Sequence, residues 1–255
     1  MILRKPVVEY HVRAYLKAIL WFVGIYMGIY LLSLSLAGVT VYNEGVHVGI
    51  SGIEFAFGLF FMICAMATYR EENNFLLQHG VSRKAIFSGF AVSALIAAAI
   101  GAILMVLIDE AARGLLAIPG VNVRMDSLFL QLFGSWVNTV GRVPAILVNL
   151  LWIWLLFLVL SVLGYFLANL YYRLSKLGKV LLPVGAGVLV ISLPPILFSI
   201  GGGRVGTALL RWINWMFVGR GEIAAPANSM IVFSLFTLVF LPICWLFVRR
   251  FQVKK

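Results

Sequence analysis

Residues 85–108 read AIFSGFAVSALIAAAIGAILMVLI, a run of 24 residues without one charged side chain. A helix of that length extends about 36 Å at about 1.5 Å per residue, which is enough to cross roughly 30 Å of hydrocarbon. Five further apolar runs have a similar length. The six runs predict membrane-spanning helices at residues 18–37, 48–68, 85–108, 144–168, 180–200 and 230–248.

The composition supports the same fold class. Hydrophobic residues make up 63% of the chain and charged residues only 11%, so no connecting segment is polar enough to form a soluble domain. We therefore expect an all-α membrane protein with one domain over residues 1–255. The two cysteines, Cys64 and Cys244, fall inside predicted spans as apolar filler, and no residue spacing is typical of a metal site.

The basic residues divide unequally between the two sides of the predicted spans. Alternate connecting segments carry fourteen Lys and Arg residues on one side and six on the other. Because basic residues mark the cytoplasmic side, we expect a multi-pass protein of the cell membrane with both termini in the cytoplasm. The net charge of +11 flanks spans, so the predicted partner of these charges is the lipid bilayer and not nucleic acid.

Three short segments outside the spans have helical patterns. Residues 6–17 place apolar side chains on one face and Glu9, Arg13 and Lys17 on the other, which predicts an amphipathic interfacial helix, the alternative being the frayed start of the first span. Residues 128–137, with Asp126 or Ser127 as cap, and residues 207–218 are apolar but too short to span. They predict re-entrant or interfacial helices on the outer face.

Two features inside the spans are candidates for specific contacts. Gly24 and Gly28 have the four-residue spacing that permits close helix packing. Glu54 lies about 9 Å inside the second span at about 1.5 Å per residue, where an acid is costly. We interpret Glu54 either as a residue of the substrate pathway or as a structural partner of Arg113, Arg204 or Arg211.

The cytoplasmic loop before residue 85 has the strongest local pattern, YREENNFLLQHGVSRK over residues 69–84. Glu71 and Glu72 suit the start of a short helix, and Gly80 suits its end. Three apolar residues between them, Phe75, Leu76 and Leu77, need a surface to cover them. That surface is either the bilayer or a groove on a soluble partner.

This loop resembles the coupling-helix loop of the type-2 exporter permeases of the ATP-binding-cassette (ABC) transporters. The resemblance rests on the Arg/Glu-rich stretch, Leu76-Leu77 and Gly80-Val81-Ser82-Arg83 leading into the third span. It implies a second permease subunit, identical or related, and a cytoplasmic ABC ATPase seated on this loop. Its coupling residues would be Glu71, Glu72, Phe75, Leu76, Leu77 and Gly80.

The chain itself lacks a P-loop, since Gly178-Lys179 has no glycine at the required spacing before it. ATP and Mg are therefore expected on the partner ATPase, with no cofactor and no catalytic residue in this chain. Gly49-Ile50-Ser51-Gly52 matches the Gly-x-Ser-Gly of rhomboid-type membrane proteases. No histidine lies inside a predicted span to act as base, which makes the protease a far weaker alternative.

These observations predict the permease subunit of an ABC exporter that moves an amphipathic or hydrophobic substrate, such as a peptide, out of the cytoplasm. The cargo class follows from the abundance of Phe, Leu and Trp and from the lack of buried charge. The alternative from another class is a membrane scaffold or immunity-type protein without a transport cycle. A copurifying ATPase subunit would distinguish the two.

The topology is testable by cysteine labelling in a variant that lacks the two native cysteines. A membrane-impermeant thiol reagent added outside intact cells should label single cysteines placed at Glu44, Asp126 and Glu222. It should not label cysteines placed at Gln78, Ser175 and Gln252 until the cells are permeabilised. The reverse pattern would refute the orientation drawn from the basic residues.

Overall fold

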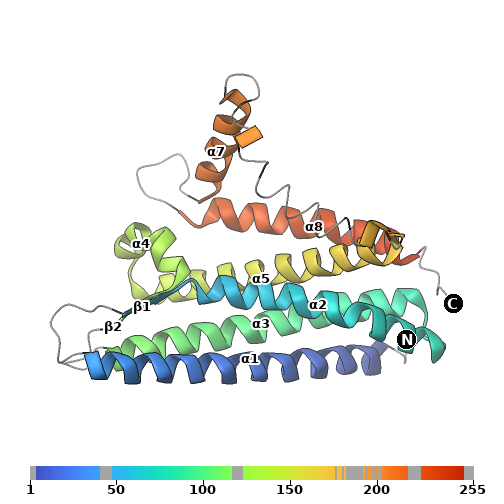
Figure 1. Cartoon of the computed structure of the whole chain (residues 1–255), viewed down its shortest axis with the longest axis horizontal. Coiled ribbons are helices and arrows are strands. Elements are labelled where there is room, and N and C mark those ends of the chain that lie inside the picture. Colours follow the sequence, from blue (N-terminus) through green and yellow to red (C-terminus); the bar gives the residue numbers. More distant parts are fainter. Residues whose placement is uncertain are drawn as a thin grey trace.

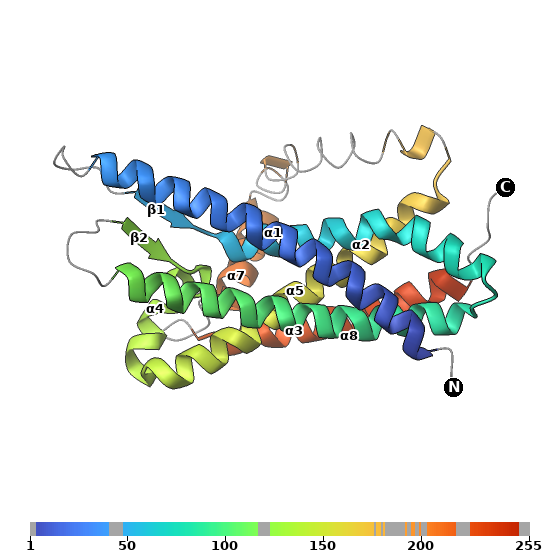
Figure 2. The same ribbon diagram turned by 90° about the horizontal axis from the view of Figure 1, so that it is seen from below.

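The computed structural model describes residues 4–40, 48–116, 123–175, 177–179, 203–217 and 225–249, together with five single residues between 181 and 199. Long helices lie side by side along one axis, with α7 standing across that axis (Figures 1 and 2). The elements are α1 (Arg4–Thr40), β1 (Val48–Ser51), α2 (Ile53–Gln78), α3 (Arg83–Leu116), β2 (Val123–Asp126), α4 (Leu128–Val140), α5 (Arg142–Arg173), α7 (Arg204–Phe217) and α8 (Ala227–Arg249).

Five helices are long and apolar enough to cross a membrane. They are Pro6–Ile29, Ile53–Gln78, Arg83–Gly114, Arg142–Arg173 and Ala227–Arg249. The helical, membrane-type fold class is confirmed, and each of these helices overlaps one predicted span. The remaining predicted span, at residues 180–200, lies almost wholly outside the described residues.

The bundle surface is apolar, as lipid requires. Large hydrophobic side chains are more than half exposed on several helices, including Trp21 on α1, Ile63 on α2, Leu107 on α3, Leu147 on α5 and Leu238 on α8. A bundle in water would present charged residues at such positions, because exposed apolar surface is unfavourable there. The exposed apolar surface and the helix lengths are therefore both consistent with a membrane environment.

The prediction that the second span begins at residue 48 is wrong. Val48–Ser51 form the short strand β1, which pairs in parallel with β2, Val48 beside Val123 and Ser51 beside Asp126. Gly52 then adopts a left-handed conformation with φ of 78° and the helix starts at Ile53. Glycine takes this conformation without the steric penalty that a Cβ would add, so Gly52 separates strand from helix.

The prediction of a separate interfacial helix at residues 6–17 is also wrong, because α1 runs without a break from Arg4 to Thr40. Its buried side chains recur every fourth residue, at Val7, His11, Tyr15 and Ile19. They pack against α2 and α3; a Cβ on Gly89 of α3 would lie 2.6 Å from Val7. The regular stripe of buried residues thus marks contact within the bundle. Because it includes Val7 and His11, it lies on a face that is rotated from the apolar face predicted opposite Glu9, Arg13 and Lys17.

The closest helix approach joins α2 to α5. A Cβ on Gly164 of α5 would fall on the backbone carbonyl of Met62 in α2. Around this point three buried rings interlock: Phe157 lies 5.1 Å from Phe61 in a stacked pair and 5.1 Å from Phe57 edge to face. The small residue at 101 leaves room for two of these rings, because a Cβ on Gly101 would lie 2.9 Å from Phe61 and 3.4 Å from Phe157.

The two glycines that were predicted to pack lie away from the close helix contacts just described. Gly24 and Gly28 face outward on α1, and a Cβ on either would meet no described atom within 4 Å. They pack against no other described residue of the chain. The close intramolecular contacts use Gly58, Gly101 and Gly164, which no four-residue spacing identifies.

Both predicted short helices form, as α4 and α7. Helix α4 packs on α5 through Phe129 and Phe133, whose rings lie 5.9 and 6.0 Å from Trp152. Helix α7 stands across the bundle beside the start of α8 (Figure 1), where Asn228 Nδ2 donates a hydrogen bond to the Trp215 carbonyl at 3.0 Å. It carries exposed Leu210 and Trp212.

Substitution of the packing glycine tests the α2–α5 contact. Gly164→Ala should destabilise the protein by about 1–3 kcal/mol, because the methyl group must displace backbone. Gly114→Ala is the matched control, since an added Cβ there meets no described atom within 4 Å; its effect should stay within about 1 kcal/mol. Thermal unfolding of both variants in one detergent gives the comparison, and equal stability would contradict the described approach.

Candidate functional site

The bundle has two chemically different ends. At the turn end, α1 begins, α8 ends and residues 79–82 join α2 to α3; at the strand end lie β1, β2 and α4 (Figures 1 and 2). The α2–α3 turn forms the tip of the bundle in both views. The predicted coupling residues lie at the turn end, and Glu54 lies at the strand end.

The α2–α3 turn has the predicted capping chemistry. Gly80 has a φ of 73°, and its N–H bonds the Leu77 carbonyl at 3.1 Å while the Val81 N–H bonds the Leu76 carbonyl at 3.0 Å. These two bonds form a Schellman motif. The Ser82 hydroxyl then accepts a hydrogen bond from the Ala85 N–H at 3.3 Å and caps α3.

The predicted coupling helix is not separate. Glu71 to Leu77 occupy the last two turns of α2, which continues from Ile53. Leu76 is buried with Val7, Val81 and Ile86, so its side chain closes the helix hairpin and does not face a partner. The contact between Leu76 and Val81 is the hydrophobic pair that accompanies a Schellman motif.

Of the other predicted coupling residues, Glu72 also faces inward, Leu77 is half-buried, and Glu71 and Gly80 are exposed. Phe75 is 46% exposed. Its ring stacks on Tyr10 of α1 at 5.8 Å between centroids and lies 4.3 Å from the His79 ring. The turn therefore presents Glu71, Phe75, His79 and Gly80 outward.

A buried polar pair ties the turn to α1. His11 Nδ1 lies 2.7 Å from Glu72 Oε2, and both side chains are almost wholly buried. Removing either partner would leave the other buried without compensation, a destabilising arrangement. The sequence analysis missed this pair, because 61 positions separate two residues that match no local motif.

Two arginines cap the end of α8. Arg83 Nη1 donates to the Arg249 carbonyl at 2.8 Å, and Arg173 Nη2 donates to the Phe247 carbonyl at 2.7 Å. The last carbonyls of a helix lack intrahelical partners, and the helix dipole favours a cation beside them. Basic residues counted as topology signals thus also join α3 and α5 to α8.

At the strand end, Glu54 acts as a cap for another helix. Its carboxylate is 2% exposed, and Oε1 accepts a hydrogen bond from the Leu128 N–H of α4 at 2.8 Å. The Ser127 hydroxyl accepts from the Leu130 N–H at 3.3 Å, which identifies Ser127 as the N-cap residue. Glu54 therefore faces the interior, and its hydrogen-bond partner is a backbone N–H group.

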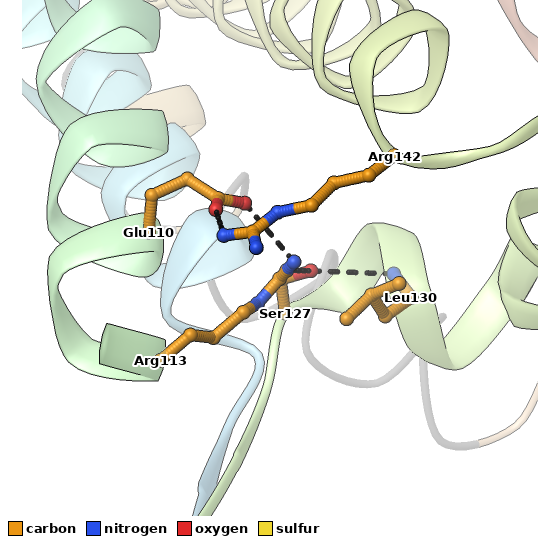
Figure 3. Close-up of polar contacts among 5 residues, drawn as sticks. All are labelled: Glu110, Arg113, Ser127, Leu130 and Arg142. Atoms are coloured by element: carbon orange, nitrogen blue, oxygen red, sulfur yellow. Dashed lines mark hydrogen bonds and ion pairs between the residues drawn. The ribbon is translucent and has the colours of Figure 1, made fainter. Parts of the chain in front are cut away.

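Next to this cap, an ion-pair network joins three helices (Figure 3). Glu110 of α3 accepts from Arg113 Nη1 at 3.0 Å and from Arg142 Nη2 of α5 at 2.6 Å. Arg113 Nη2 also lies 3.4 Å from the Ser127 hydroxyl at the start of α4. Both guanidinium groups retain further N–H donors, since each has five.

The Gly-x-Ser-Gly motif ends β1 at the strand end, whereas the described histidines, His11 and His79, lie at the turn end. His47 is outside the described residues. Within the ranges that the structure covers, no three His, Cys, Asp or Glu residues group closely enough to hold a metal ion.

No protein-family model, no curated protein and no solved structure matches this chain. Function is therefore inferred from the residues at the two ends of the bundle.

The role of Glu54 as a helix cap is testable by stability. Glu54→Leu leaves the Leu128 N–H buried without an acceptor, which should cost about 1–3 kcal/mol. Glu54→Gln keeps an acceptor oxygen and should cost less, while Ser127→Ala, which removes the neighbouring cap, should cost about 0.5–2 kcal/mol. The measurement is thermal unfolding in detergent. If Glu54→Leu unfolds at the wild-type temperature, Glu54 is not a structural cap.

Proposed function

We propose that this chain is the membrane-spanning permease subunit of an ABC exporter. A separate ATPase would bind ATP and Mg and drive export of an amphipathic or hydrophobic substrate, with peptides as the preferred class. The observation that carries the proposal is the α2–α3 turn at the tip of the bundle, which presents Glu71, Phe75 and Gly80 to the surroundings. The resemblance of residues 69–84 to coupling loops supports it.

The proposed topology has six spans in the cell membrane, with residues 180–200 as the fifth span and the turn end in the cytoplasm. Described basic residues of the turn end, among them Arg13, Arg83 and Arg173, support this orientation. Helices α4 and α7 then lie on the outer side. The exposed Leu210 and Trp212 of α7 suit a position at the lipid interface, where tryptophan is enriched.

The turn is well built to transmit a push from an ATPase. Phe75 stacks on Tyr10, Glu72 pairs with His11, and Leu76 packs among residues of α1 and α3. A displacement of the exposed turn therefore moves α1, α2 and α3 together, because packed side chains do not deform independently. The inward-facing coupling residues serve as this link, and docking falls to the exposed ones.

A second permease subunit is part of the proposal, since ABC exporters of this type work as pairs. The outward face of α1 carries Gly24 and Gly28 between the exposed side chains of Trp21 and Ile25. Small residues on a lipid-facing helix let a second helix approach closely. This face is the proposed contact with an identical or related subunit.

Docking at the turn is tested by copurification. Tagged wild-type protein purified from its native membranes should carry an ATPase subunit that hydrolyses Mg-ATP. Phe75→Asp should reduce the copurified hydrolysis at least tenfold, because it places a charge where an apolar ring would be covered by the partner. Val140→Asp, at an exposed apolar position of the strand end, should leave it unchanged.

The comparison requires that both variants unfold at the wild-type temperature. We expect this because the side chains of Phe75 and Val140 are 46% and 40% exposed. Wild-type protein without any associated ATP hydrolysis would favour the scaffold or immunity-type alternative. Hydrolysis that survives Phe75→Asp would move the docking surface away from this turn.

A further inference from the structure

Three exposed arginines from three helices meet at the turn end of the bundle, around the point where α8 ends (Figures 1 and 2). Arg83 starts α3, Arg173 ends α5 and Arg249 ends α8. Arg83 and Arg173 reach the last carbonyls of α8, those of Arg249 and Phe247. Positive charge concentrated at one point of a surface favours an anionic partner.

Two of the guanidinium groups are held in fixed positions. Their hydrogen bonds to the Arg249 and Phe247 carbonyls are 2.8 and 2.7 Å long, and the Arg173 guanidinium lies over the Phe247 ring with Cζ 4.8 Å from the centroid. Carbonyls two residues apart on a helix lie about 5 Å from each other, so the two bonded donors are at most about 10 Å apart. Because the side chains are already ordered, binding an anion costs them little conformational entropy.

Both guanidinium groups have N–H donors to offer a ligand. Each carries five donors in a planar fork that suits phosphate oxygens, and each uses one of them on a carbonyl of α8. Arg83 belongs to α3 and Arg173 to α5, so a phosphate between them would join the two helices that flank the end of α8.

The described residues supply no carboxylate that cancels this charge. Helices α5 and α8 contain no acidic residue, and the two acids of α3 lie at the strand end. On α1 and α2, Glu9 is paired with Arg13 and Glu72 with His11. If the exposed Glu71 and the roughly half negative charge of the α8 dipole are both counted against the three arginines, an excess of about 1.5 positive charges remains.

An apolar surface adjoins the arginines on α8. Leu246 is 57% exposed, and Trp245 and Phe247 are half-buried on either side of it. Tryptophan is enriched where lipid headgroups meet hydrocarbon, and the Trp245 ring lies 5.4 Å from that of Phe87 on α3. A partner that covers both surfaces must combine negative charge with apolar chains.

We infer that the end of α8 binds an anionic phospholipid, with its phosphate between Arg83 and Arg173 and its acyl chains against Leu246. Charge complementarity at the arginines and the apolar surface beside them carry the inference. In the proposed topology the bound lipid belongs to the inner leaflet. The site lies wholly within this chain, so it does not depend on an ATPase or on a transported substrate.

The test compares dioleoyl phosphatidylglycerol with dioleoyl phosphatidylcholine, whose choline cancels the phosphate charge. Native mass spectrometry of the purified protein in an uncharged detergent resolves the first bound lipid during a titration. Phosphatidylglycerol should bind about tenfold more tightly, because each arginine beside an anionic headgroup contributes a factor of about three to five. Equal affinities of the wild-type protein for the two lipids would overturn the inference.

The double variant Arg83→Gln, Arg173→Gln should lose the preference for phosphatidylglycerol, while the glutamine amides keep N–H donors for the α8 carbonyls. The matched control is Arg13→Gln, Lys17→Gln, which removes two exposed charges from α1 and should keep the preference. Equal loss in both double variants would mean attraction by overall surface charge and would overturn the site.

Thermal unfolding in the same detergent shows whether each variant is folded. If the first double variant is not, the single variants Arg83→Gln and Arg173→Gln replace it, each with the preference reduced about threefold. Glycerol 3-phosphate, which has the phosphate without the acyl chains, should not displace the bound phosphatidylglycerol at equal concentration. Displacement would identify a soluble phosphate compound as the ligand and contradict the lipid assignment.

Discussion

The structure depends on one constraint: helix ends placed away from water must find partners for their backbone groups within the protein. At two described helix ends, the partners include side chains of other helices. Glu54 of α2 and Ser127 serve the start of α4, while Arg83 of α3 and Arg173 of α5 serve the end of α8. Because the caps come from neighbouring helices, satisfying backbone also fixes which helices are neighbours.

This constraint explains what sequence could and could not predict. Capping by Gly80 and Ser82 and the helix at residues 128–137 were predictable, because glycine and serine act on backbone groups within a few residues. The approximate positions of five spans were predictable from length and apolarity. The caps that join distant helices were not, since a carboxylate 74 residues from the amide it binds leaves no spacing pattern.

The errors have the same origin. The pattern of residues 6–17 was interpreted as a membrane-surface helix, yet this segment buries Val7, His11 and Tyr15 against α2 and α3. Apolar periodicity reports that a face is covered and does not identify what covers it. Leu76 is the same case, an apolar residue in a predicted docking loop that is covered by Val7 and Val81 of its own chain. The GxxxG spacing of Gly24 and Gly28 is the opposite case, because no described residue of the chain covers either glycine.

The contact between Gly164 and Met62 has a mechanical consequence. Backbone pressed on backbone resists sliding, and the hydrogen bond from the Tyr69 hydroxyl to Asn169 Oδ1 ties α2 to α5 a second time. Met62 lies 16 residues before Gln78 and 9 residues after Ile53, arms of about 24 and 14 Å at about 1.5 Å per residue. The contact at Met62 therefore lies well inside the helix, about 12 Å from Glu54 and about 24 Å from the tip of the bundle at about 1.5 Å per residue. Two ties on one pair of helices oppose relative motion of α2 and α5, so the cap that Glu54 supplies to α4 and the hairpin closed by Leu76 are carried by one stiff helix pair.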